Sequence, residues 1–456
     1  MAIVGAGLSG NLLAILLARH GHKITVYERG VAPEQAAQDG GRSINLALAA
    51  RGIRALELAG ALDAVEPLLL PMPGRIVHGV DRSERFLPYG QFESERIWSV
   101  SRQALNQALI EIARNRLDVT YRFEHACVDF DSATLRATVR SKSGDTAIEP
   151  RLLLAADGAG SVIRRRLAES GALAAREELL DHGYKELTVP AAPDGGFALT
   201  AEGLHIWPRG GFMLIALPNL DRTFTATLFL PHTGRPGFDT ITADNVVEFF
   251  GQEFPDAVEL IPNLAEEFAA HPTGTLGTVY CEPWTLAHDG GHGRAVLLVG
   301  DAAHAIVPFH GQGMNAAFED CAELGRLASS PDPDWAGIAL EFESARRDNA
   351  CAIAEMALEN YLEMRDTVRD PAFERRAALS FELERRFPGR FIPRYSMVMF
   401  HPEIGYAEAQ RRGRIQASIL DQALSQSGAE DRLALAAALV ERELQPLPDI
   451  KPRPPP

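Results

Sequence analysis

The hydrophobic pattern at the start of the chain changes twice within residues 1–28. A short apolar run, 2–4, leads into a glycine-rich turn, and leucine and isoleucine then recur at helical spacing up to Gly21. Glycine is common directly after the last turn of a helix. A second apolar run, 23–27, ends at Glu28. The succession of strand, helix and strand predicts a βαβ unit and therefore a parallel sheet.

Two later apolar runs have the same character. Residues 152–156 lead into Asp157-Gly158, and residues 296–299 lead into Gly300-Asp301. Uninterrupted apolar runs are typical of strands that are buried on both faces. Both runs are therefore predicted to be buried strands, each followed at once by an aspartate and a glycine.

The middle and the end of the chain follow other patterns. Within residues 182–280, polar and apolar positions alternate, and the runs 212–217 and 223–229 flank a Pro-Asn-Leu-Asp turn, which predicts an antiparallel hairpin in a separate sheet. From about residue 320 the pattern is helical and rich in alanine, glutamate and arginine. The proline-rich tail, 446–456, is predicted to be extended and disordered.

Composition narrows the class of protein. The 456 residues are 46% hydrophobic and 23% charged, as in ordinary globular proteins of several domains. The formal net charge of −16 argues against nucleic acid and anionic membrane surfaces as partners. The four cysteines form no CxxC pair, which excludes a disulfide scaffold, offers no zinc site and fits a reducing compartment. The chain shows no apolar run of membrane-spanning length and no secretory signal, so we expect a cytoplasmic enzyme without a transmembrane segment or a metal.

The motif Gly5-x-Gly7-x-x-Gly10 carries the first chemical signal, because it lies between a predicted strand and a predicted helix. Glycines there allow a tight turn and a close approach to a pyrophosphate, which the N–H groups and dipole of the helix N-terminus then bind. Glu28 at the end of the next strand is placed to bind an adenosine ribose, and its charge repels a 2′-phosphate. The site therefore suits FAD or NAD and not NADP.

A bound flavin explains the remaining motifs better than a nicotinamide dehydrogenase does. No second GxGxxG follows a strand, so any second nucleotide binds transiently. Asp301, after a buried strand, is placed to bind a polyol such as a ribityl chain. The segment 311–315 precedes a further predicted helix, whose N–H groups suit the flavin N1/C2=O edge.

These motifs, in this order, resemble the group A flavoprotein aromatic hydroxylases, and within that group the kynurenine 3-monooxygenases. The resemblance spans about residues 1–400 and depends on specific strings at residues 41–48, 182–187, 308–315 and 363–366. It implies an α/β fold with a Rossmann-type FAD-binding domain, like that of para-hydroxybenzoate hydroxylase, an antiparallel-sheet substrate domain and a helical C-terminal region. The expected boundaries are 1–70, 100–181 and 281–328 for the FAD domain, 71–99 and 182–280 for the substrate domain, 329–445 for the helical region, and 446–456 for the tail.

The motifs and the resemblance together place a set of residues at the cofactor. The resemblance identifies Asp157-Gly158 as a motif that serves both FAD and the passing NADPH, with Arg164 placed to attract phosphate, although Asp157 is equally explained as a helix N-cap. Arg102 resembles the group's flavin-contacting arginine, and a surface ion pair is its alternative. The expected cofactor-binding residues are Gly5, Gly7, Leu8, Ser9, Gly10, Glu28, Arg29, Arg42, Leu46, Ala47, Arg102, Cys127, Asp157, Asp301, Gly313, Met314 and Asn315.

For the substrate, the resemblance implies that Arg75 and Tyr89 hold a carboxylate, with Asn360 and Tyr395 assisting. A local guanidinium is the group needed to fix an anion on an acidic protein. Taken singly, Arg75 is as well explained by a solvated surface, Tyr395 by the edge of a core and Asn360 by an exposed helix face. The apolar wall around the substrate ring is expected to include Phe224, Phe309 and His310, and ordinary packing is the alternative for the phenylalanines.

The implied activity is NADPH-dependent hydroxylation of L-kynurenine to 3-hydroxy-L-kynurenine with O2, through a flavin C4a-hydroperoxide. The flavin carries this chemistry, so no general acid or base is assigned. The family serves tryptophan catabolism or pyridine nucleotide biosynthesis. Two alternatives stay open at this point: a group A hydroxylase for another amino-aromatic substrate, and a non-catalytic flavin-binding regulator.

Overall fold

The computed structural model describes residues 1–35, 45–288, 293–330, 333–366, 371–426 and 428–447, so Arg42 lies outside the described residues. The chain forms two compact units, each assembled from three segments. The first unit comprises Met1–Leu69, Val100–Leu180 and Gly277–Ala354. The second comprises Leu70–Ser99, Asp181–Leu276 and Glu355–Pro456.

The first unit is built on a six-stranded sheet. Its strand order is β18 (Thr285–His288), β19 (Arg294–Leu298), β12 (Leu152–Ala155), β1 (Ala2–Val4), β2 (Ile24–Tyr27) and β8 (Val119–Arg122). All neighbouring strands run parallel except β18, which is antiparallel to β19. The predicted parallel sheet is thereby confirmed. Because β1, β12 and β19 are parallel and in register, the turns that follow them meet at one edge of the sheet.

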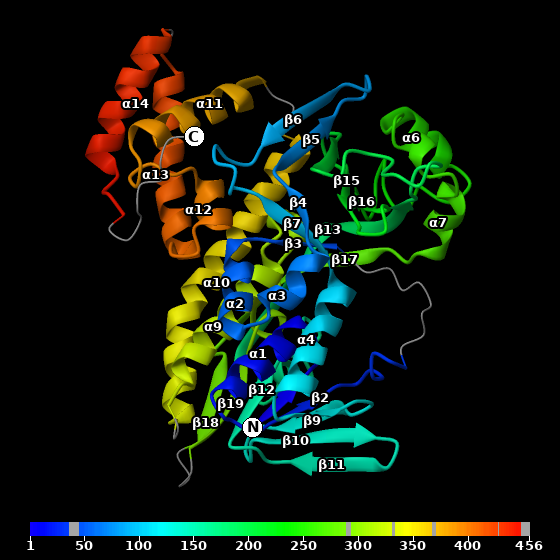
Figure 1. Ribbon diagram of the computed structural model, residues 1–456, viewed down its shortest axis with the longest axis vertical. Helices are drawn as coiled ribbons and strands as arrows, with labels where there is room; N and C mark the ends of the chain where they lie inside the picture. Colours follow the sequence, from blue (N-terminus) through cyan, green and yellow to red (C-terminus); the bar gives the residue numbers. More distant parts are fainter. Residues whose placement is uncertain (36–44, 289–292, 331–332, 367–370, 427, 448–456) are drawn as a thin grey trace. The chain divides into compact units, whose positions relative to one another are not determined.

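Helices cover this sheet. The helix α1 (Leu8–Arg19) follows β1, and the helices α4 (Arg102–Arg116) and α9 (Gly313–Leu327) both pack against α1 (Figure 1). The other elements of the first unit include β3 (Asn45–Leu48), α2 (Ala50–Ala59), α3 (Leu62–Val65), η1 (Glu66–Leu68), α8 (Asp301–His304) and η3 (Pro308–His310). A small antiparallel sheet of β9 (Ala126–Asp131), β10 (Arg136–Ser141) and β11 (Gly144–Ile148) packs through β9 on α5 (Val162–Glu169).

The second unit contains most of a seven-stranded sheet. Its order is β17 (Gly274–Glu282), β13 (Ala174–Val189), β16 (Phe224–Pro231), β15 (Met213–Pro218), β14 (Leu204–Pro208), β5 (Gly74–His78) and β6 (Glu84–Pro88). The antiparallel pairing of β15 with β16 confirms the predicted hairpin. A further antiparallel pair joins β4 (Leu70–Met72) to β7 (Ile97–Ser101).

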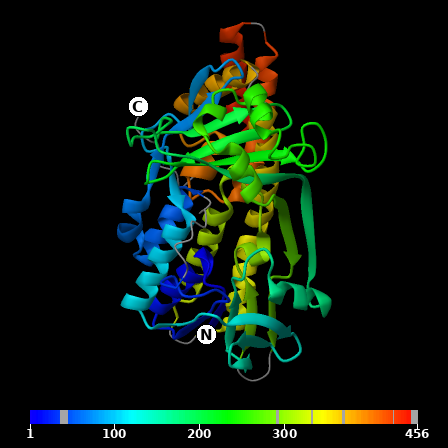
Figure 2. The same ribbon diagram turned by 90° about the vertical axis from the view of Figure 1, so that its right-hand side faces the viewer.

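One face of this second sheet is covered by short helices. The helices α6 (Val246–Glu253) and α7 (Leu264–Ala270), with η2 (Val258–Leu260) between them, lie beside the strands in Figures 1 and 2. Phe224, Leu228, Trp207 and Phe250 belong to the apolar core between these helices and the sheet. Side chains alternate between the two faces of a strand, so the neighbours of these core residues along each strand lie on the opposite face of the sheet.

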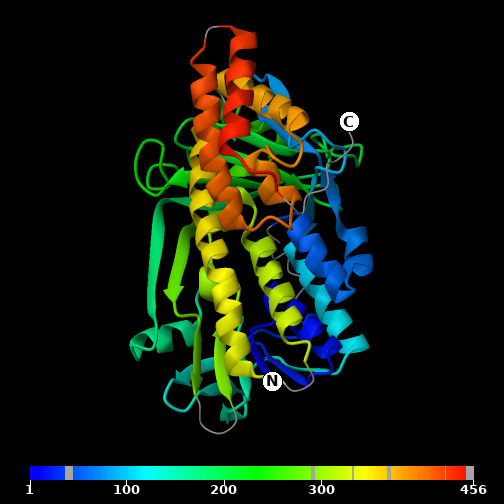
Figure 3. The same cartoon turned by 90° about the vertical axis from the view of Figure 1, so that its left-hand side faces the viewer.

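Helices dominate the end of the chain, as predicted. The helix α10 (Trp335–Asp366) begins in the first unit and ends in the second. It is followed by α11 (Pro371–Arg386), α12 (Arg394–Phe400), α13 (Tyr406–Leu424) and α14 (Ala429–Glu443). In Figure 3, α13 and α14 lie side by side, and residues such as Leu383, Ile419 and Val440 form a core there.

Three further observations concern the C-terminal region and the described helices. Residues 329–445, expected as a region of their own, are divided between the two units after Ala354. Of the expected tail, residues 446 and 447 are described, and Leu447 N–H donates to the Gly389 carbonyl at 2.8 Å. Among the described helices, none has the length and apolar character that a bilayer crossing requires.

Candidate active site

The turn between β1 and α1 leaves space where a phosphate would bind. Gly5 has φ +102°, and a Cβ on Gly10 would lie 2.0 Å from the Gly5 carbonyl oxygen, so both positions require glycine. A Cβ on Gly7, in contrast, would meet no atom within 4 Å. The N-terminus of α1, at Leu8 and Ser9, has neither a side-chain cap nor an acidic residue in its first turn. Its N–H groups and positive dipole end therefore suit a pyrophosphate.

Glu28 is held in place directly beside this turn. Its two carboxylate oxygens accept hydrogen bonds from the backbone N–H groups of Ala6 at 2.8 Å and Gly30 at 2.7 Å. The carboxylate thus has a fixed orientation and retains lone pairs for ribose hydroxyls. Arg29 is exposed and Cys127 is half-buried on β9. Burial, and next the charge of Asp157, raise the pKa of the Cys127 thiol to about 12, so this thiol stays protonated.

Asp157 follows β12 and keeps one oxygen for a ligand. Its Oδ2 accepts the Val162 N–H at 2.8 Å, whereas Oδ1 is buried without a hydrogen-bond partner among the described residues. Burial raises the pKa of this carboxyl. The side chain that caps α5 is Ser161, which accepts from Arg164 N at 3.0 Å. An unpartnered buried oxygen is what a hydroxyl of FAD would satisfy.

Arg164 has a structural role and is not placed to attract phosphate. Its guanidinium is 4% exposed and donates to the Ala302 carbonyl at 2.9 Å and to the Ala159 carbonyl, and it forms an ion pair with Glu177 at 2.8 Å. These contacts tie the turn after β12 to α8. The expectation drawn from its position beside Asp157 is therefore corrected.

The turn after β19 is fixed by a buried ion network that the sequence analysis missed. Asp301 is half-buried at the first position of α8, and Gly300 before it has φ +59°. The Gly300 N–H donates to Asp320 Oδ2 at 3.2 Å, and the same carboxylate pairs with His304 at 2.5 Å and Arg346 at 2.8 Å. Asp320 is fully buried. It therefore fixes the turn that places Asp301 at the edge of the sheet.

Asn315 joins the start of α9 to β3. Its Oδ1 accepts the Ala49 N–H at 2.9 Å, and its Nδ2 donates to the carbonyls of Ala47 and Gly311 at 2.8 Å each. Because its side chain is engaged in this way, Asn315 positions the neighbouring backbone. Leu46, Ala47, Gly313 and Met314 are half-buried, and α9 carries no acidic residue in its first turn.

Three other expected site residues, Arg102, Phe309 and His310, also lie in the first unit. Arg102 is exposed at the first position of α4. Phe309 and His310 form part of η3 and are each 5% exposed, so neither presents a wide open surface.

A second cluster, in the second unit, surrounds Arg75 on β5. Arg75 is 7% exposed, and its guanidinium carbon lies 5.5 Å from the ring centroid of Tyr89 and 5.0 Å from that of Tyr395. The two rings stack with centroids 5.3 Å apart. The structure therefore brings three of the expected substrate residues together. Because Arg75 is buried, a solvated surface position does not explain it.

Two donor atoms of this cluster have no hydrogen-bond partner among the described residues. Arg75 Nε and the Tyr89 hydroxyl are buried without a hydrogen-bond partner among the described residues. Burial raises the pKa of both Tyr89 and Tyr395, so their hydroxyls remain protonated and able to donate. A guanidinium beside phenol hydroxyls provides the kind of donors that a carboxylate requires.

The helix α10 brings two more polar groups to the cluster. Glu363 Oε1 lies 3.9 Å from Arg75 Nη1, and its side chain is 32% exposed. Asn360 precedes Glu363 by one helical turn and therefore shares its face. It is 3% exposed, contrary to the exposed-face alternative, and its Nδ2 lies 3.3 Å from Met364 Sδ. Glu363 was missed as a site residue, although it lies in one of the strings that carry the resemblance.

Phe224 lies on the other face of the sheet. It belongs to the core under α6 and α7 and contacts the His205 ring at a centroid distance of 5.5 Å. His205 pairs with Ile76 in the parallel β14–β5 ladder, so Arg75, the adjacent residue on β5, faces the opposite way. Phe229 alternates with Phe224 and is the phenylalanine of the hairpin that shares the face of Arg75.

Comparison with known proteins decides the family. Residues 1–340 match the family model described as FAD binding domain. The chain is 47% identical over 453 residues to a kynurenine 3-monooxygenase of Xanthomonas axonopodis pv. citri, covering 98% of this chain and 97% of the relative. A kynurenine 3-monooxygenase of Stenotrophomonas maltophilia is 47% identical over 440 residues, covering 96% and 95%. The chain belongs to the kynurenine 3-monooxygenase family.

Solved structures show the same fold outside this family. A 2-methyl-3-hydroxypyridine-5-carboxylic acid oxygenase matches with a TM-score of 0.63 at 21% identity, covering 81% of this chain and 94% of that one. A p-nitrophenol 4-monooxygenase from Pseudomonas putida matches with a TM-score of 0.64 at 15% identity, covering 95% and 97%. The expected flavin hydroxylase fold is thus confirmed, and the protein is a flavoprotein monooxygenase with an FAD-binding domain.

Proposed function

We propose that this protein hydroxylates L-kynurenine to 3-hydroxy-L-kynurenine, using bound FAD, NADPH and O2 through a flavin C4a-hydroperoxide. Membership of the kynurenine 3-monooxygenase family supports the substrate. The observation that carries the proposal is the buried Arg75 cluster with its unpartnered donors.

The substrate is an α-amino acid, and the cluster offers a partner for each of its charges. Its carboxylate would accept hydrogen bonds from Arg75 and from the hydroxyls of Tyr89 and Tyr395. Its ammonium group would pair with Glu363, which lies 3.9 Å from Arg75 and is partly exposed. Two opposite charges at this separation match the zwitterion and leave the aromatic ring to the apolar residues.

The residues of the first unit fit FAD. Gly7 leaves open space before the uncapped N-terminus of α1, Glu28 has a fixed carboxylate, and Asp157 keeps a buried oxygen without a partner. These groups would hold the pyrophosphate, the adenosine ribose and a further hydroxyl of the cofactor. When bound, FAD supplies the redox chemistry and the activation of oxygen. The chain binds and orients the substrate and keeps water from the reacting ring.

The decisive experiment is a product assay. Purified FAD-loaded protein is incubated with L-kynurenine, NADPH and ¹⁸O2, and the product is analysed by mass spectrometry. We expect 3-hydroxykynurenine that contains one ¹⁸O atom, and NADPH oxidation coupled to its formation. If anthranilate or 4-hydroxybenzoate couples NADPH oxidation to hydroxylation and L-kynurenine does not, the substrate assignment is wrong.

A further inference from the structure

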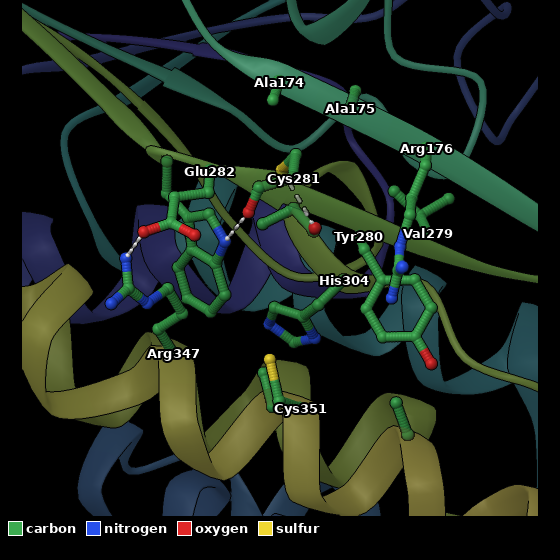
Figure 4. Close-up of a pocket in the computed structure, with 14 residues that line it drawn as sticks. Ala174, Ala175, Arg176, Val279, Tyr280, Cys281, Glu282, His304, Arg347 and Cys351 are labelled. Atoms are coloured by element: carbon green, nitrogen blue, oxygen red, sulfur yellow. Dashed lines mark hydrogen bonds and ion pairs between the residues drawn. The ribbon is translucent and has the colours of Figure 1, made fainter.

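A cavity of about 360 Å³ lies within the first unit, apart from the residues assigned to FAD or to kynurenine (Figure 4). Its walls come from β13, β17, α8 and α10. Its volume is at the lower end of the range for small-molecule sites. The function proposed above uses none of the side chains that project into it.

Two walls of the cavity carry small side chains. Ala174 and Ala175 on β13 form one wall, and Ala350 and Ala354 on α10 form part of another. Figure 4 shows Ala174 and Ala175 across the cavity from Cys351, which projects from α10. Alanine side chains leave a slot between a strand and a helix, and a flat ring fits a slot better than a branched aliphatic group does.

Aromatic side chains line this slot and are already packed against neighbours. Trp284 is 2% exposed, its Nε1 donates to the Cys281 carbonyl at 3.0 Å, and its ring stacks on His304 with centroids 5.0 Å apart. Tyr280 on β17 supplies a second ring. Both rings are held by neighbours before any ligand arrives, so little side-chain freedom would be lost on binding a planar molecule.

The two arginines of the cavity differ in how far their charge is neutralised. Arg347 pairs with Glu282 and lies 3.7 Å from Glu343. Arg176 lies over the Tyr280 ring at 4.3 Å, and its ion pair within the described part of the chain is with Glu178 at 3.3 Å, with both side chains at least half exposed. An exposed pair of this kind contributes little stability, so a ligand anion can replace Glu178 at low cost. Arg176 is therefore the anion-binding end of the slot.

We propose that this cavity is a second small-molecule site, which binds a planar aromatic molecule carrying one carboxylate. The carboxylate pairs with Arg176, and the ring lies in the slot beside Tyr280 and Trp284. A fused bicyclic aromatic acid fits the volume, and 2-naphthoate is the probe that we choose.

Cys351 reports occupancy of the site. It lines the cavity and is exposed, whereas Cys281 is buried and its pKa is raised to about 12 by that burial, so Cys281 reacts slowly with alkylating agents. The FAD-loaded full-length protein is treated with iodoacetamide at increasing 2-naphthoate, and alkylation is followed peptide by peptide. Glutathione added to the mixture serves as the reference, because Cys127, like Cys281, has a thiol pKa of about 12. We expect 2-naphthoate to slow the alkylation of Cys351 several-fold without changing that of glutathione.

Matched compounds and variants separate the effect of the carboxylate–Arg176 pair from the effect of filling the slot. Neutral 2-naphthamide should protect Cys351 far less, and Arg176→Gln should weaken 2-naphthoate binding about fivefold. Arg140→Gln is the control, because Arg140 is also an exposed strand arginine with one carboxylate partner, Asp145 at 2.8 Å. In Ala175→Trp, the indole fills the slot, so Cys351 should react slowly without the probe and 2-naphthoate should have no further effect.

Four outcomes would overturn the proposal: no protection of Cys351, equal protection by 2-naphthamide, equal weakening by Arg140→Gln, or loss of protection in Arg75→Ala. The last result would place the probe in the kynurenine site instead. The readout needs no turnover, so it is independent of the kynurenine assignment.

Discussion

At the scale of single residues, the proposed carboxylate site depends on the buried donors of Arg75 and Tyr89. A buried donor without a partner costs about 1–3 kcal/mol. Arg75 Nε and the Tyr89 hydroxyl are two such donors, side by side. A carboxylate would satisfy both at once, and because the rings of Tyr89 and Tyr395 already hold the guanidinium, little order would have to be created on binding.

Arg75→Ala should therefore weaken L-kynurenine binding by about 1.5–3 kcal/mol, the range for hydrogen bonds to charged groups. FAD content should stay at the wild-type level. Titration of the flavin absorbance with kynurenine measures the affinity. Arg82→Ala is the control, because Arg82 lies in the same unit and is 55% exposed in its ion pair with Glu259. Unchanged kynurenine affinity in Arg75→Ala would refute the carboxylate site.

Glu363→Gln tests the partner of the substrate ammonium group. The loss of one partly exposed charge should raise the dissociation constant of L-kynurenine about fivefold. The desamino analogue 4-(2-aminophenyl)-4-oxobutanoate lacks the ammonium group, so its affinity should not fall. Both constants come from the same flavin titration. An equal loss for both compounds would show that Glu363 acts only through the shape of the site.

At the scale of elements, two glycines in the turn between β1 and α1 differ in what surrounds them. A Cβ at Gly10 would collide with the Gly5 carbonyl, whereas a Cβ at Gly7 would enter open space. Gly7 has φ −74° and an extended conformation that alanine adopts without strain. The fold therefore requires glycine at position 10, whereas at position 7 we expect the bound cofactor, and not the fold, to require it.

Gly7→Ala should consequently leave the melting temperature of the apoprotein within about 2 °C of the wild type and weaken FAD binding about tenfold or more. Differential scanning fluorimetry and fluorimetric titration with FAD measure the two effects. Gly251→Ala in α6, where a Cβ also meets nothing within 4 Å, should leave FAD affinity unchanged. If Gly7→Ala binds FAD as the wild type does, the pyrophosphate does not approach this glycine.

The elements α8, α9 and α10 are joined to each other by the carboxylate of Asp320. Asp320→Asn removes the buried negative charge that pairs with His304 and Arg346, whereas Arg346 keeps its pair with Glu319 at 2.9 Å, so it should lower the free energy of unfolding by about 1.5–3 kcal/mol. FAD affinity should fall as well, because the Gly300 N–H loses a charged acceptor. Urea unfolding measures the first effect. Glu341→Gln, in an exposed pair with Arg326, should change stability by less than about 1 kcal/mol.

At the scale of the whole molecule, buried carboxylates make the fold sensitive to acid. Burial acts to raise the pKa of Asp320, but the charges and hydrogen bonds of His304 and Arg346 outweigh it and hold the pKa below the ordinary value. Asp256 behaves in the same way beside His78 and Trp207. A carboxyl with a lowered folded pKa stabilises the fold above its unfolded pKa, about 4, and this contribution is lost as the pH falls through the folded pKa.

The free energy of unfolding should therefore fall steadily as the pH is lowered below about 4. The decline should be shallower in Asp320→Asn, because one of the contributing groups is absent. Urea unfolding curves at a series of pH values, recorded for both proteins, measure the two slopes. Parallel slopes would show that Asp320 does not titrate between the folded and unfolded states in the way described.

The local elements were predictable because their signals are contiguous in the chain. The βαβ unit, the hairpin of β15 and β16 and the turns after β12 and β19 each depend on a few adjacent residues and on backbone conformation. The faces of the strands were predictable only in part. Phe224 and Phe229 necessarily point to opposite faces, but only the placement of α6 and α7 decides that the face of Phe224 is the core.

The order of strands and glycine turns, the nucleotide-binding character of the first segments and the family resemblance follow from the sequence alone, because short-range sterics and hydrogen bonding specify them. Tertiary structure decided that Arg75 and Asn360 are buried, that Glu363 meets Arg75, that Arg164 is a structural tie and that Asp320 holds the turn before Asp301. Each of these depends on contacts between segments far apart in the chain. Burial and electrostatic pairing arise from such packing, and periodicity along one strand or helix does not specify its partner.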